Sequence, residues 1–305
     1  MNVSAGLIAL ALGVSACGGS SPAAPTASTT TSTTTTTPTT PTGTSSTLRM
    51  YTSASPTGPW TLSTATVTGH DALGLVDPSP ILMSDGSILL YYLMSYTQGG
   101  DPAAAQPNNQ WKMGVAKSTD NGVTFAHQAV AYTFGSSTTD PFPLLLDSGL
   151  IRLLASQGSR VPSVTATSTT GVTFAASQDP GFRVTSGGVP GALKVGGTFY
   201  IYGCGSGGIL YFSSSDGLSF SSGGTSVGLT STGTICDPSP IDNGGGTYLM
   251  AFKKGTGGGP STDSTYMATS TDGKRWTELG LVGQGSVPGL VKDRTGTLRI
   301  YAVGF

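Results

Sequence analysis

The sequence predicts an all-β fold, a five-bladed β-propeller whose last blade is closed by strands from the N-terminal end of the domain. Three observations lead to this prediction: a proline-led phrase that occurs five times, a serine-rich turn phrase that recurs between the prolines, and two chain ends that complete one another. A period of about 50 residues with strand-like content is typical of propellers, in which each repeat forms one blade.

The proline-led phrase is a Pro, in three copies preceded by Asp, that opens an apolar run. Its copies span residues 77–81, 140–144, 189–193, 237–241 and 287–290. The prolines lie 63, 49, 48 and 50 residues apart. Because the first strand of every blade lines the central channel, we expect Asp77, Asp140 and Asp237 to converge on one axis.

The turn phrase has the form Ser-x-Asp-Gly with an aromatic residue close behind. Its copies span residues 118–125, 168–174, 214–220 and 270–276, with a degenerate copy at 52–60. The phrase resembles the Asp-box turn, or BNR repeat, of sialidase-type propellers. In such a turn the Asp or Ser side chain caps the backbone, Gly adopts a positive φ, and the aromatic packs between blades. We therefore interpret these turns as structural.

The two ends of the domain each supply half of one blade. Residues 280–305 provide only its first two strands, whereas residues 48–51 and 60–62 at the front match a third and a fourth. Pairing the two halves closes the ring and leaves no free strand edge. The predicted propeller therefore spans residues 48–305.

The longest connections point to one face of the propeller. They join the second and third strands of the first and fourth blades, at residues 96–111 and 254–266. These connections and the three aspartates fall on the same predicted face. Long loops on one face of a repeat protein usually form the binding site.

The N-terminal segment predicts export. Residues 1–17 are apolar but too short to span a bilayer, and they end in Val-Ser-Ala-Cys17, which resembles the lipobox of bacterial lipoproteins. The resemblance implies lipidation of Cys17 and a membrane anchor at the cell surface or in the periplasm, with an ordinary secretory signal as the alternative. Residues 18–47 are almost entirely Ser, Thr, Pro, Ala and Gly, which predicts a disordered linker.

Composition limits the partners. Only 10% of the residues are charged and the net charge is −1, without a basic patch, so nucleic acid is not expected as a partner. No His/Cys cluster has metal-ligand spacing and no phosphate-binding loop stands out, so we expect neither a metal nor a cofactor. We also expect a monomer.

The repeat places Cys204 and Cys236 as neighbours beside Asp237, either as a disulfide or as two buried thiols.

Residues 48–305 resemble the five-bladed propeller glycosidases of the arabinanase, levansucrase and invertase type. The resemblance rests on Asp-Pro openings followed by a Gly turn and an aromatic strand, as in residues 77–92. It implies that Asp77 is the base or nucleophile and that Asp140 is the second axial Asp. The acidic Glu of those enzymes has no match, because Val189 and Asp237 stand at the corresponding openings. Two carboxyl groups in different protonation states are needed to cleave a glycosidic bond. We assign the acid role to Asp237 and expect its pKa to be raised.

The remaining candidates for substrate binding are Tyr96, Trp111, His70 and Arg160. Tyr96 and Trp111 form either a sugar-stacking rim or part of the core. His70 reaches the site or is a surface histidine. Arg160 resembles an arginine of sialidase motifs, but the other arginines do not open first strands, so a sialidase is disfavoured. The chain's single Glu, Glu278, is predicted on an outer strand away from the axis.

Three functions are compatible with these features. The leading hypothesis is an exported glycoside hydrolase-like propeller that binds, and with the three aspartates hydrolyses, an oligosaccharide or polysaccharide. The first alternative is a glycan-binding surface module without catalysis, favoured by the missing Glu. The second is a structural propeller that interacts with proteins.

Overall fold

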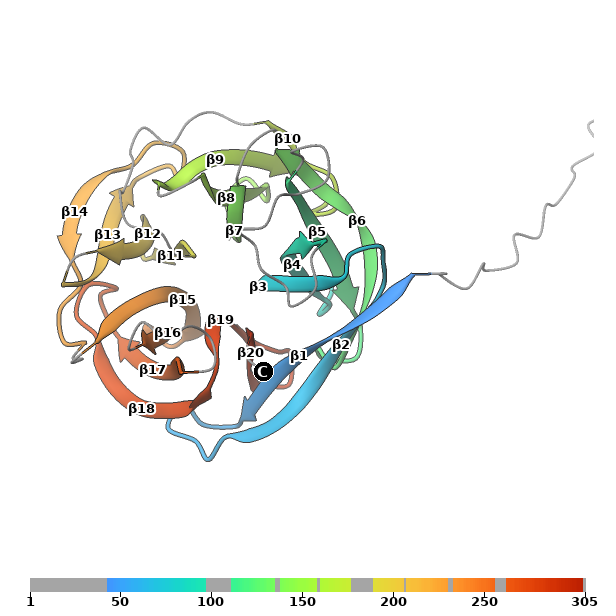
Figure 1. Cartoon of the computed structure of the whole chain (residues 1–305). Coiled ribbons are helices and arrows are strands. Elements are labelled where there is room, and N and C mark those ends of the chain that lie inside the picture. Colours follow the sequence, from blue (N-terminus) through green and yellow to red (C-terminus); the bar gives the residue numbers. More distant parts are fainter. Residues whose placement is uncertain are drawn as a thin grey trace, which may run out of the picture. The chain divides into compact units, whose positions relative to one another are not determined.

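All elements of the computed structural model within its described residues are β-strands (Figure 1). The structure describes residues 43–96, 111–134, 138–157, 160–176, 189–205, 207–229, 233–255 and 262–303. The predicted signal peptide, Cys17 and nearly all of the predicted linker lie outside them. In the described part of the chain no helix is long and apolar enough to cross a membrane.

The strands form one eight-stranded sheet and three four-stranded sheets. The large sheet has the order β19-β20-β1-β2-β6-β5-β4-β3. Its strands are β1 (Thr44–Ser53), β2 (Thr61–His70), β3 (Gly74–Leu82), β4 (Ile88–Ser95), β5 (Trp111–Ser118), β6 (Thr124–Phe134), β19 (Ser286–Lys292) and β20 (Leu298–Val303).

The three smaller sheets follow one another along the chain. The first contains β7 (Thr138–Leu145), β8 (Ile151–Gln157), β9 (Arg160–Ser168) and β10 (Ala175–Ala176). The second contains β11 (Gly191–Val195), β12 (Thr198–Gly205), β13 (Gly208–Ser214) and β14 (Ser221–Thr225). The third contains β15 (Thr234–Gly244), β16 (Thr247–Gly255), β17 (Ser264–Ser270) and β18 (Thr277–Gln284). Figure 1 shows β3, β7, β11, β15 and β19 nearest the centre of a propeller-like arrangement.

The N-terminal strands complete the C-terminal half of the large sheet, as the sequence predicts. β1 pairs antiparallel with β20, from Arg49↔Ala302 to Ser53↔Leu298. β1 begins at Thr44, a little ahead of the boundary expected at residue 48. β2 then runs parallel to β6 over three residue pairs, from Thr66↔Thr124 to Thr68↔Ala126. This short parallel pairing joins the two halves of the eight-stranded sheet.

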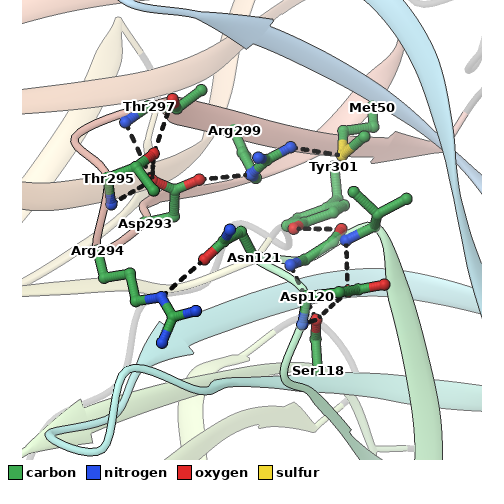
Figure 2. A network of polar contacts seen from close by, with 12 residues as sticks. Met50, Ser118, Asp120, Asn121, Asp293, Arg294, Thr295, Thr297, Arg299 and Tyr301 are labelled. Atoms are coloured by element: carbon green, nitrogen blue, oxygen red, sulfur yellow. Dashed lines mark hydrogen bonds and ion pairs between the residues drawn. The ribbon is translucent and has the colours of Figure 1, made fainter.

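Side chains at the turn between β19 and β20 fasten this closure (Figure 2). Asp293 accepts hydrogen bonds from the backbone N–H groups of Thr295 and Thr297, and it pairs with Arg299 Nε at 2.9 Å. A guanidinium nitrogen of Arg299 lies 3.6 Å from the sulfur of Met50 on β1. The C-terminal hairpin is thereby tied to the N-terminal strand.

A recurring hydrogen bond links a strand of one repeat to a turn of the next repeat, three times between sheets and once, from β20, within the eight-stranded sheet. A donor on β4, β8, β12 or β20 reaches the backbone carbonyl of a turn glycine in the following repeat. The pairs are Tyr91 OH to Gly171 O at 2.7 Å, Arg152 to Gly217 O at 2.6 Å, Tyr202 OH to Gly273 O at 2.8 Å and Tyr301 OH to Gly122 O at 2.9 Å. Figure 2 labels Tyr301, the donor of the last of these bonds. We call these four contacts the inter-repeat clasps.

The turn aromatics pack on the same tyrosines. Edge-to-face pairs join Tyr91 to Phe174, Tyr202 to Trp276 and Tyr301 to Phe125, with ring centroids 5.7, 6.0 and 5.5 Å apart. Each turn caps itself as expected; in the first copy the Gly122 N–H donates to Ser118 Oγ at 2.8 Å. Because neighbouring sheets cover both faces of a strand, all eight residues of β4 are buried. The alternating pattern of a half-buried strand is therefore absent there.

Both histidines of the chain lie beside the β2–β6 junction. His70 of β2 is only 1% exposed, so the prediction of a surface histidine is wrong. Its Nδ1 lies 3.0 Å from Thr44 Oγ1, and His127 Nδ1 of β6 lies 2.6 Å from Tyr92 OH. Burial lowers the pKa of His70; burial, together with the nearby His70 charge, lowers the pKa of His127.

We expect deletion of the chain through residue 62 to cause aggregation, because it removes β1 and exposes the edge of β20. Deletion through residue 42 removes only residues that precede β1 and should leave the melting temperature unchanged. Size-exclusion chromatography and thermal denaturation of both truncations check this. A monomeric, fully stable protein lacking residues 1–62 would contradict the closure described above.

Stability should fall as the pH is lowered through the range in which unfolded histidine gains its proton, near 6.5. A pKa lower in the folded state means that the unfolded chain binds more protons there, so each histidine costs at most about 1.4 kcal/mol per pH unit. Thermal denaturation from pH 7.5 to 5 measures the effect, and the double variant His70→Gln/His127→Gln should show a flatter profile. An equally steep profile in the double variant would rule out the histidines as its cause.

Candidate functional site

Each Asp-Pro opening forms a β-bulge in an innermost strand. The strand pairing skips between Val76 and Ser79, between Thr139 and Phe142, and between Cys236 and Ser239. Asp77, Asp140 and Asp237 have positive φ angles of 54°, 61° and 52°. Aspartate tolerates this left-handed conformation better than most residues, and a bulge redirects the side chain that it carries. The strand distortion therefore sets the direction in which these carboxylates point.

The Val-Pro-Gly copies show why the other openings differ. Val287 also has a positive φ, of 52°, so the conformation belongs to the repeat and not to aspartate alone. A Cβ on Gly289 would lie 2.0 Å from the carbonyl oxygen of Pro78, and one on Gly191 would lie 2.2 Å from that of Pro238. Glycine is required where the innermost strand of a neighbouring repeat approaches this closely.

Asp77 and Asp140 are directly linked. The Asp140 N–H donates to Asp77 Oδ2 at 3.2 Å, and Asp140 Oδ2 accepts from Thr139 Oγ1 at 2.6 Å. Asp77 is 4% exposed. Burial, together with the Asp140 charge, raises the pKa of Asp77 well above its usual range; burial also raises the pKa of Asp140. This pair therefore retains a proton under conditions in which an exposed aspartate has lost it.

Asp237 lies in a different electrostatic environment. Its Oδ1 accepts the Val189 N–H at 3.1 Å, and its Oδ2 forms an ion pair with Lys253 Nζ at 2.7 Å. Lys253 Nζ also lies 3.8 Å from Asp263 Oδ2. An adjacent ammonium group favours the ionised form of a carboxylate. The raised pKa values are found at Asp77 and Asp140, whereas the carboxylate of Asp237 faces a lysine.

A disulfide joins Cys204 of β12 to Cys236 of β15, with the two Cα atoms 4.8 Å apart. Cys236 immediately precedes Asp237, and the Asp237 N–H lies 3.3 Å from Cys204 Sγ. The disulfide thus ties the backbone at Asp237 to the neighbouring sheet.

The predicted substrate-binding residues are only partly brought to this site. Trp111 is 4% exposed within a hydrophobic cluster, so it belongs to the core and not to a stacking rim. Tyr96 is half-buried and donates to Asp71 Oδ1 at 3.0 Å, with Lys112 Nζ 5.1 Å from its ring centroid. Arg160 opens strand β9 rather than lying in the preceding loop, and its side chain is outside the described residues. Most of the predicted binding loops, residues 97–110 and 256–261, are outside them too.

Lys253 and Asp263 are site residues that the sequence patterns did not predict. A lysine directly after the buried run Tyr248–Phe252 was an available signal, because lysine is seldom buried without a partner. Glu278, in contrast, is where the sequence predicts it, on the outer strand β18. Both of its oxygens accept from Lys254 Nζ, at 2.7 and 2.6 Å.

A cavity of about 410 Å³ opens farther along the same innermost strands. Its wall is mostly apolar and includes Pro80, Phe142, Pro143, Leu193 and Pro240, with charged side chains such as Asp147 and Lys194 among the lining residues. None of the three aspartates lines it. The three carboxylates and this cavity therefore lie at different positions along the innermost strands.

Comparison with known proteins relates the fold to one class of enzymes. No protein-family model matches the sequence, and no curated protein matches it. Solved structures of glycoside hydrolases do share its fold. A thermostable family-43 glycoside hydrolase aligns with TM-score 0.56 and 14% identity, over 74% of this chain and 83% of its own.

Two further structures give the same result. An α-L-arabinofuranosidase from Clostridium thermocellum aligns with TM-score 0.55 and 12% identity, over 75% of this chain and 82% of its own. An endo-1,4-β-xylanase from Bacteroides thetaiotaomicron aligns with TM-score 0.53 and 16% identity, over 74% and 84%. The chain therefore has the propeller-type fold of glycoside hydrolases.

We expect Asp77→Asn to stabilise the protein increasingly as the pH rises from 4 to 8. A carboxyl group whose pKa is raised by folding binds more protons in the folded state, so stability falls with rising pH by at most about 1.4 kcal/mol per unit. The amide removes this dependence while keeping an oxygen for the Asp140 N–H. Thermal denaturation across this pH range measures the gain.

The matched control is Asp147→Asn, at an exposed ion pair with Lys194 beside the apolar cavity. Its melting temperatures over the same pH range are the reference for those of Asp77→Asn. A constant difference between Asp77→Asn and the wild-type protein would contradict the raised pKa of Asp77.

Proposed function

We propose that this chain is an exported, carbohydrate-active five-bladed propeller of the glycoside hydrolase type, with its site at Asp77, Asp140 and Asp237. The observation that carries the proposal is that the carboxyl groups at the openings of the innermost strands have two different surroundings. One retains a proton and the other faces a lysine. Hydrolysis of a glycosidic bond needs these two states side by side.

The charges suggest roles opposite to those expected from the sequence. Protonated Asp77 is the general acid and gives its proton to the leaving oxygen of the glycosidic bond. Asp140, hydrogen-bonded to Asp77, holds that group in its protonated form and orients it. Ionised Asp237 is the base that activates water or the nucleophile that attacks the sugar. In either case it bears the charge that an oxocarbenium-like transition state requires.

The proposal also includes five blades, an aromatic contact to the sugar and a lipid anchor. The eight-stranded sheet counts as two blades joined by the β2–β6 pairing, which with the three smaller sheets gives five. Tyr96, half-buried and followed by the long connection to β5, is the remaining aromatic candidate for sugar contact. Export with a lipid anchor at Cys17, by way of the Ser/Thr/Pro-rich linker, would display this propeller at a bacterial membrane as a monomer.

The test is hydrolysis of 4-nitrophenyl glycosides of arabinose, xylose and mannose by the wild-type protein. We expect turnover with a bell-shaped pH profile, and a loss of about 10²–10⁴-fold in kcat for Asp77→Asn, as for removal of a general acid. Asp237→Asn should lose at least as much. Asp147→Asn, beside the apolar cavity, is the matched control. Unchanged kcat in Asp77→Asn would contradict the proposed role of this residue.

A second candidate function is glycan binding without turnover. It is favoured by the position of Glu278, which is held by Lys254 on an outer strand and so does not supply the acid found in the similar enzymes. In this case a glycan array would show binding that is lost in Asp77→Asn and Asp237→Asn, while no glycoside in the panel is cleaved.

A further inference from the structure

We propose that Lys253 is a positioning residue of the carboxylate site: it reaches Asp237 from the neighbouring strand and holds this carboxylate in place through a buried ion pair. This inference deepens the proposed function and rests on it for its kinetic consequence. The ionisation of Asp237 can be measured without any substrate.

The strand register places Lys253 at the site. Lys253 on β16 pairs across the strands with Cys236 on β15, the residue directly before Asp237. Its Nζ lies 2.7 Å from Asp237 Oδ2, and its side chain is 20% exposed. The lysine therefore reaches the carboxylate from a neighbouring strand and remains largely shielded from water.

Asp263 fixes the far side of the lysine. This residue is 5% exposed, and its Oδ2 lies 3.8 Å from Lys253 Nζ and accepts a hydrogen bond from Ser286 Oγ at 3.0 Å. The backbone carbonyl of Asp263 accepts the Gly285 N–H at 3.0 Å. Because Ser286 opens β19, the lysine connects the innermost strands β15 and β19 through Asp263.

The charges around Lys253 are predominantly acidic. Asp237 faces it from β15, Asp263 from the residue before β17, and Asp140 acts on it from β7. Burial lowers the pKa of Lys253, but these carboxylates outweigh burial and raise it. The lysine thus stays charged while its partners are ionised. Without it, Asp237 and Asp263 would be buried carboxylates with no cation between them.

Lys254 provides a matched control. It is the next residue on β16, so its side chain points to the opposite face of the strand. It has an ion pair of its own, with Glu278, and comparable burial, at 15% exposed. Lys254→Met therefore removes the same charge from the same strand without touching Asp237.

The decisive experiment is a pH titration of the protein labelled with ¹³C at the aspartate side-chain carboxyl, with the Asp237 signal assigned by its loss in Asp237→Asn. In Lys253→Met we expect the Asp237 midpoint to move upward by at least one pH unit, a tenfold change in protonation. Lys253→Arg should keep the wild-type midpoint, and so should Lys254→Met. Identical Asp237 titrations in the wild-type protein and Lys253→Met would overturn the proposal.

A double-variant comparison decides the question if Lys253→Met does not fold. Lys253→Met/Asp237→Asn removes the unpaired charge and should melt at a higher temperature than Lys253→Met alone. A double variant no more stable than the single one would overturn the proposal. Given turnover of a 4-nitrophenyl glycoside, the acidic limb of kcat/KM should move with the NMR midpoint in Lys253→Met and not in Lys254→Met. Absence of turnover in the wild-type protein would overturn the proposed function, whereas the titration decides the role of Lys253.

Discussion

The inter-repeat clasp is the contact on which the rest of this structure depends. Each clasp combines a hydrogen bond to a turn glycine, worth about 1 kcal/mol, with, in three of the four cases, an edge-to-face aromatic pair worth about as much again. The clasp also explains the glycine: a Cβ at Gly122 would lie 2.0 Å from Tyr301 OH. On β16, Ala251 takes the register position that Tyr91, Tyr202 and Tyr301 occupy on their strands. The turn of the following repeat, at residues 52–60, is the degenerate copy of the phrase. In this repeat, the tyrosine donor and the regular turn sequence that would accept its hydrogen bond are thus both missing.

A ring held in this way fixes the positions of the innermost strands. The β-bulges in these strands then determine where their side chains point. A bulge with positive φ is costly for a β-branched residue, yet Val287 adopts one, so the scaffold enforces this conformation there without an aspartate. Aspartate at such a position relieves part of the cost and accepts a backbone N–H from the adjoining repeat, as Asp77 does from Asp140 and Asp237 from Val189. The hydrogen bonds that stabilise the strand openings therefore also fix the positions of the carboxylates.

The structural features that repeat along the chain could be predicted from the sequence. The period of the prolines predicts the four-stranded units, and the complementary ends predict the β1–β20 pairing, because both depend on local patterns that the chain states several times. The features that occur once were harder to predict. Lys253 meets Asp237 only through the register of two strands, and the burial of His70 follows from a parallel contact between β2 and β6 that no hairpin implies. Trp111 shows a related difficulty, since an aromatic residue after a long loop fits a rim and a core equally well until its neighbours are known.

The charge balance at the carboxylates disfavours an anionic ligand and is compatible with the proposed carbohydrate. Asp77, Asp140, Asp237 and Asp263 are buried or half-buried, and among the described residues Lys253 pairs with only two of them, Asp237 and Asp263. The four carboxyl groups therefore cannot all be ionised at an acceptable desolvation cost. An anionic ligand would add to this excess. Sugar hydroxyls bring no charge and donate hydrogen bonds, which ionised carboxylates accept strongly. Burial, together with this excess of negative charge, raises the pKa of Asp77 and Asp140, so this pair keeps a proton. In the proposed function, these crowded aspartates would supply the acid for which the sequence has no glutamate at the openings of the innermost strands.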